Sequence, residues 1–119
     1  MKPPFCVNDS PTIDPGALDV FQSTSALERY LELWFVDEPH FIFDSDGLQL
    51  AIAPTKRGVS LAAREPRTMN PEIARYYFAT FLKSIARAKC WAFVGQTEDF
   101  VETATLSELA QASVKFATR

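Results

Sequence analysis

The first regular pattern along the chain is an apolar stripe at helical spacing. Leucine, tyrosine and tryptophan recur at i, i+3, i+4 and i+7, as Leu27, Tyr30, Leu31 and Trp34, which places them on one helix face. Ser25 and Glu28 have the spacing of an S-x-x-E capping box. Pro39 bars continuation of the helix. The pattern therefore predicts a helix over residues 26–35.

The apolar period then changes from 3.6 to 2, which indicates strands. Three alternating runs are separated by turn signals at residues 44–47 and 54–58. They predict a three-stranded antiparallel meander with one apolar face. We expect that face to hold Phe41, Phe43, Leu48, Leu50, Val59 and Leu61. Two helical stripes would cover it, Leu27/Leu31/Trp34 and Ile73/Tyr77/Phe81.

Two further helices have clear start signals. Asn70 and Pro71 suit the N-cap and first helical positions of a helix over residues 71–88. Thr105 and Glu108 form a second capping-box pattern that opens a helix running to about residue 116. Between them, residues 91–94 read as a short fourth strand or as more helix, and their aromatic and β-branched content favours the strand.

These elements predict an α+β fold in which a three- or four-stranded antiparallel meander packs against two to three helices. The order of elements is α-β-β-β-α-(β)-α. Residues 1–22 contain four prolines and few periodic apolar positions. Because proline fixes φ and removes a backbone donor, we expect an extended N-terminal arm, followed by a single α+β domain over residues 23–119.

Composition supports a single globular domain. The chain has 119 residues, of which 47% are hydrophobic and 23% charged, values that exclude a disordered chain. No apolar run reaches the ~18–20 residues that a membrane span needs. The first residues also lack the apolar stretch of a secretory signal. We therefore expect a cytoplasmic protein without membrane association; the oligomeric state stays open.

The charges are unevenly distributed although the net charge is only −3. Residues 1–55 carry nine acidic and two basic side chains, a sum of −7, whereas residues 56–119 sum to +4. Four of the acidic residues fall at adjoining ends of predicted elements: Asp37, Glu38, Asp44 and Asp46. If these side chains cluster, they form a candidate patch for a basic protein partner.

The sequence contains no motif for catalysis, metal binding or cofactor binding. Its one histidine, His40, and two distant cysteines, Cys6 and Cys90, cannot supply a zinc site, and we expect free thiols with Cys90 packed. Residues 44–47 resemble part of a calcium loop, but the positions that need carboxylates at its ends are apolar. No phosphate-binding glycine loop or nucleophile elbow occurs. We expect a non-enzymatic protein without cofactors.

Residues 56–89 offer an alternative, because they contain eight basic and two acidic side chains. Such a segment attracts phosphate through counterion release, so a small nucleic-acid-associated or regulatory protein is the second hypothesis. The acidic isoelectric point of about 5.1 argues against it.

Residues 23–52 also resemble a known family. A helix ending in an acidic residue (23–32 and 36–37) precedes an aromatic strand, an Asp-x-x-Gly turn and an apolar strand (41–50). This opening is similar to that of small bacterial immunity proteins encoded beside polymorphic or contact-dependent toxins. The resemblance implies a protein that binds and neutralises a cognate toxin domain, whose identity and activity stay open. It transfers no site residue.

Overall fold

The computed structural model describes residues 1–8, 17–31 and 41–117. It confirms the α+β class, with more elements than the sequence predicted. The strands are β1 (Phe5–Asn8), β2 (Leu18–Phe21), β3 (Phe41–Phe43), β4 (Gln49–Thr55) and β5 (Gly58–Ala63). The helices are α1 (Thr24–Tyr30), α2 (Pro71–Ala88), α3 (Trp91–Val94), α4 (Glu98–Thr103) and α5 (Leu106–Val114).

The five strands form one antiparallel sheet in the order β2-β1-β3-β4-β5. The segment expected to be an arm thus supplies two strands, and β1 lies in the interior of the sheet between β2 and β3. Its prolines fall outside the four-residue strands Phe5–Asn8 and Leu18–Phe21, so no ladder donor is lost there. The sheet therefore begins well before residue 23.

Both faces of the sheet are covered, which corrects the expected single apolar face. Ile42 pairs with Leu50 and lies in a core with Leu27 of α1. Phe43 points the other way and packs with Tyr77 in the core beneath α2. Side chains alternate along a strand, so the assignment of residues 41–43 to faces was wrong by one residue. Ile73, expected in the covering stripe, is 41% exposed.

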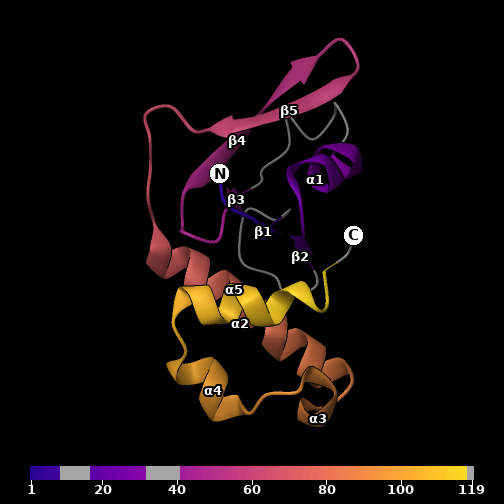
Figure 1. Ribbon diagram of the computed structural model, residues 1–119, viewed down its shortest axis with the longest axis vertical. Helices are drawn as coiled ribbons and strands as arrows, with labels where there is room; N and C mark the ends of the chain where they lie inside the picture. The colour runs from indigo at the N-terminus through magenta and orange to yellow at the C-terminus, as the bar shows by residue number, and fades with distance from the viewer. Residues whose placement is uncertain (9–16, 32–40, 118–119) are drawn as a thin grey trace.

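Helices α2 to α5 form a separate layer on one side of the sheet, whereas α1 packs beside β5 on the other side (Figure 1). Helix α5 crosses α2, and α3 and α4 lie at the end of the molecule away from the sheet. Residues 91–94 are helical rather than a strand, and Gly95 ends the helix in the left-handed conformation at φ 79°. None of the helices in the described part of the chain is long and apolar enough to span a bilayer.

The local start signals succeeded at two helices and failed at one. Asn70 caps α2, and Thr105 with Glu108 forms the complete capping box of α5. Helix α1 instead begins after Ser23, whose side chain accepts from the amide of Ala26. It ends at Tyr30, because Leu31 adopts an extended conformation, so it is shorter than expected. The Glu28 carboxylate contacts β5 rather than the start of its own helix.

Candidate functional site

Asp44 of the predicted acidic patch is buried and holds a turn together. Its Oδ1 accepts hydrogen bonds from the amides of Asp46 and Leu48, both at 2.9 Å. Its Oδ2 accepts from the amide of Lys2 at 3.0 Å. The side chain is 2% exposed, so Asp44 is not available to a partner. A carboxylate that accepts several backbone amides is the expected core of such an Asx turn.

Asp46 is the exposed acidic residue of this turn, and its carboxylate lies 3.8 Å from Lys2 Nζ. Asp37 and Glu38 lie outside the described residues, as does His40. Within the part of the chain that the structure describes, the predicted patch is therefore reduced to Asp46, whose charge Lys2 partly offsets.

The basic side chains of residues 56–89 are divided between the hairpin tip and the helical layer, where some are used in contacts within the fold. Lys56 and Arg57 lie at the tip of the β4–β5 hairpin, far from the helical layer (Figure 1). Arg75 is used inside the helical layer, where it donates to the carbonyls of the residues that end α4: Val101, Glu102 and Ala104. Lys83 forms an ion pair with Glu102. A continuous phosphate-binding surface would need these groups side by side.

An acidic surface lies instead on the C-terminal helices. Residues 90–114 contain four acidic side chains and no lysine, arginine or histidine. All four are exposed: Glu98, Asp99, Glu102 and Glu108. We call these four residues, with the two hollows described next, the acidic helical surface. Only Glu102 among them is paired with a cation of the described chain.

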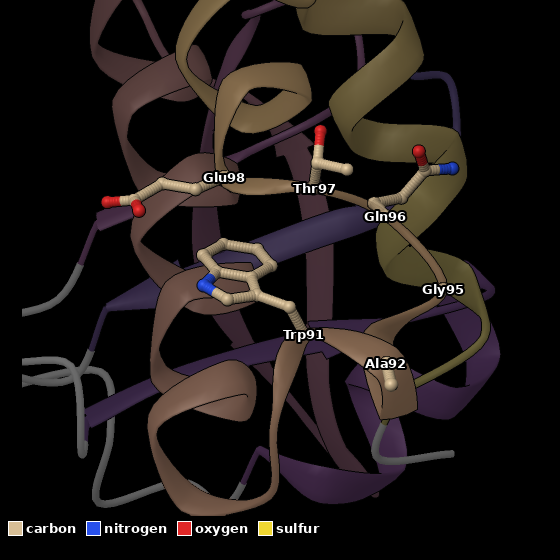
Figure 2. A pocket seen from close by; sticks show the side chains of 6 residues that line it. All are labelled: Trp91, Ala92, Gly95, Gln96, Thr97 and Glu98. Carbon is tan, nitrogen blue, oxygen red and sulfur yellow. The ribbon is translucent and has the colours of Figure 1, made fainter.

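The first hollow lies between α3 and the start of α4 (Figure 2). It has a volume of about 510 Å³ and is open to solvent. Its lining residues are Trp91, Ala92, Gly95, Gln96, Thr97 and Glu98. The indole of Trp91 lies beneath the segment that joins the two helices, and the Glu98 side chain extends outward beside it. The indole is half-buried and packs against the core under α2.

A second hollow of about 420 Å³ adjoins the first, because both are lined by Gln96. Its other lining residues are Phe100, Ser107, Glu108, Gln111 and Ala112. Each hollow thus combines one half-buried aromatic side chain with one exposed carboxylate. Together they provide apolar contact area bordered by negative charge, which is a combination suited to a protein interface.

Several contacts fix the backbone of this surface. Thr97 Oγ1 accepts from the amide of Phe100 and begins α4, and the three hydrogen bonds of Arg75 satisfy carbonyls at its end. The reciprocal bonds of Thr105 and Glu108 begin α5. Short helices need such caps, since few of their backbone groups pair internally. The hollows are therefore held in place partly by two of their own lining residues, Thr97 and Glu108, and partly by Arg75 and Thr105.

Two of the carboxylates are kept ionised by their neighbours. The hydrogen bond and charge of Lys83 lower the pKa of Glu102. Hydrogen bonds from Thr105, first from its backbone and then from its side chain, lower the pKa of Glu108. Because both pKa values lie below those of ordinary glutamates, the surface keeps these negative charges at neutral and mildly acidic pH.

The thiols differ from the expectation in one respect. Cys6 is fully buried, and desolvation, followed by the nearby Asp19 charge, raises its pKa well above the usual range. Cys90, expected to be packed, is exposed at the N-cap of α3. Both are free. Histidine, cysteine and carboxylate side chains form no group suited to a metal ion in the described chain.

Sequence reasoning missed the acidic helical surface because the charge sum of residues 56–119 is positive. The run of 25 residues without a basic side chain was a signal that could have shown it. Comparisons with protein families, with characterised proteins and with solved structures give no match.

Proposed function

We propose that the chain is a non-enzymatic protein-binding domain that acts as an immunity protein, binding and neutralising a basic toxin domain. The observation that carries the proposal is the acidic helical surface, with Glu98, Asp99 and Glu108 exposed around two aromatic hollows. The resemblance of residues 23–52 to immunity proteins supports the same class. We place this action in the cytoplasm, where an inhibitor would meet a toxin that has entered the cell.

Charge complementarity is the physical basis of the proposal. A toxin that cleaves nucleic acid needs basic side chains to hold phosphates, and an acidic inhibitor is attracted to that same surface. Complementary potentials raise the association rate, while buried aromatic anchors slow dissociation. Lys56 and Arg57 lie apart from Arg75 and Lys83, and the latter two are engaged in contacts with α4, which favours this proposal over a nucleic-acid-binding function.

Growth protection tests the proposal. The C-terminal domain of the protein encoded beside this chain is expressed in bacteria with and without the chain, and affinity is measured with the purified pair. We expect the chain to restore growth and to bind the toxin domain. The variant Glu98→Lys/Asp99→Lys should lose most protection, because both side chains are exposed and lie at one end of α4.

The matched control is Asp46→Lys, which reverses an exposed charge in the turn between β3 and β4 and is not part of the acidic helical surface. It should protect as well as the wild type. Failure of the wild-type chain to bind or protect would overturn the immunity function. Full protection by Glu98→Lys/Asp99→Lys would overturn the assignment of the acidic helical surface as the interface.

A further inference from the structure

The hollow beside Trp91 has the parts of a site for a planar cation. An indole supplies an electron-rich face, and the Glu98 carboxylate borders the same hollow. Gln96 and Thr97 add polar groups at its margin. A cation over the face of tryptophan is attracted by the ring quadrupole, and a neighbouring carboxylate adds an ion pair.

Glu98 is available for such a ligand. It is exposed and forms no ion pair with any cation of the described residues. The ammonium of Lys115 borders the hollow on the side of Gly95, since its Nζ would lie 3.5 Å from a side-chain carbon added there. That ammonium lies 5.6 Å from the centroid of the Phe116 ring, however, and not within ion-pair distance of Glu98. The carboxylate of Glu98 can therefore pair with a cation from outside the chain.

The lining of the hollow, an indole and a carboxylate, favours guanidinium over ammonium. A guanidinium ion is planar, stacks on an aromatic face and offers a fork of donors that matches a carboxylate. It is also less strongly hydrated than an ammonium ion, so it loses less when it enters a partly apolar hollow. A volume of about 510 Å³ is ample for one arginine side chain.

The hollow is also preformed. Trp91 packs against the core beneath α2, so the indole has little freedom left to lose on binding. Gly95 ends α3 in the left-handed conformation, and the Thr97 cap begins α4 two residues later. A preformed aromatic platform loses less conformational entropy on binding than a mobile one.

We infer that the Trp91–Glu98 hollow binds an arginine side chain of a basic protein partner, with the guanidinium on the indole and paired with Glu98. This inference rests on the proposed function for the identity of the partner, whereas the site itself is defined by its own residues. Asp99, one residue further along α4, adds negative charge near the same end of the helix. The partner's arginine would be an anchor of the interface.

A short peptide tests the site without the toxin. Acetyl-Gly-Arg-Gly-amide is titrated into the ¹⁵N-labelled full chain, and the indole N–H resonance of Trp91 is followed, assigned with the variant Trp91→Phe. We expect a saturable shift with the arginine peptide. The peptide with citrulline, which is similar in shape but neutral, should bind about tenfold more weakly, and the lysine peptide should also bind more weakly.

Variants locate the binding. Glu98→Gln keeps the size of the side chain but removes its charge, and it should lower the affinity for the arginine peptide about five- to tenfold. The control Glu65→Gln removes an exposed charge from the segment before α2 and should change nothing. Equal binding of the arginine and citrulline peptides, or no effect of Glu98→Gln, would overturn the inference.

The outcomes separate this inference from the proposed function. If the chain protects against the toxin but does not bind the arginine peptide, the immunity function stands and the arginine site is overturned. If the chain binds the peptide through Glu98 but neither binds nor neutralises the toxin, the site stands and the immunity function is overturned.

Discussion

The Oε2 atom of Glu28 accepts a hydrogen bond from the backbone amide of Leu61 at 2.8 Å. Glu28 lies in α1 and Leu61 in β5, which forms one edge of the sheet. In the antiparallel pair of β4 and β5, the backbone groups of residues 58, 60 and 62 face β4, in phase with the bond from the Arg64 amide to the Gln49 carbonyl. The amide of Leu61 therefore points away from β4. A helix side chain thus satisfies a donor of the edge strand and attaches α1 to the sheet.

Replacing this carboxylate should destabilise the fold. We expect Glu28→Ala to lower the free energy of unfolding by about 1–3 kcal/mol, the usual range for losing a hydrogen bond to a charged group. Glu28→Gln keeps an acceptor and should lose less. Urea denaturation followed by circular dichroism measures both. Arg29→Ala, at the exposed neighbouring position, serves as the control, and an equal loss there would contradict the role of Glu28.

The contact also shows why sequence rules located some helix starts and not others. Asn70 and Thr105 act within a few residues of their own positions, so their patterns predicted the caps correctly. Ser25 and Glu28 have the same spacing as Thr105 and Glu108, yet Glu28 bonds to a residue 33 positions away. A local pattern cannot show such a tertiary partner.

The position of Phe43 gives a second prediction. Its ring lies edge-on to Tyr77 with centroids 5.4 Å apart, and the residue is 2% exposed. Phe43→Ala should leave a cavity under α2 and lower the free energy of unfolding by about 3–5 kcal/mol. Ile73→Ala on the same helix layer should lower it far less, since Ile73 is 41% exposed. Chemical denaturation measures both variants, and equal shifts of their denaturation midpoints would contradict this packing.

Residues 41–43 were difficult to assign because all three are apolar and both sides of β3 are covered. Alternation reveals a face only where one side is polar. In the sheet, Phe43 pairs with Cys6 of β1 on one side and with Gln49 of β4 on the other. Because the sequence did not predict β1 as a strand, half of this pairing was missing from the expected register. The acidic helical surface was missed for a similar reason, since charge sums over half the chain do not show which side chains share a surface.

The two carboxylates of the 44–47 turn should contribute very differently to stability. Asp44→Ala removes the acceptor for three backbone amides, so we expect a loss of about 2–4 kcal/mol in the free energy of unfolding, more than a single hydrogen bond contributes. Asp46→Ala removes an exposed pair with Lys2 and should change it by less than about 1 kcal/mol. Thermal and urea melts measure both. A stable Asp44→Ala variant would show that the turn does not need this side chain.

The buried thiol of Cys6 should make the fold sensitive to alkaline pH. Burial raises the pKa of Cys6 above its usual value of 9.0, so the folded chain keeps this proton when the unfolded chain has released it. The folded state then binds more protons, and its stability falls as pH rises above about 9. Below that pH the two states hold the same proton and the effect is absent. Burial likewise raises the pKa of Tyr77 above 10.0.

Variants at the two cysteines separate this contribution from general alkaline denaturation. We expect the free energy of unfolding of Cys6→Ala to fall less steeply between pH 9 and about 11, by up to roughly 1.4 kcal/mol per pH unit for one proton. Cys90→Ala, which removes the exposed thiol, serves as the control. Burial raises the pKa of Tyr77 in both variants, whereas the smaller rise caused by the charge of Cys6 is lost in Cys6→Ala, so the difference in slope reports Cys6 together with its effect on Tyr77. Urea denaturation at a series of pH values gives the slopes, and identical slopes for Cys6→Ala and Cys90→Ala would show that the Cys6 thiol ionises as readily in the folded chain as in the unfolded one.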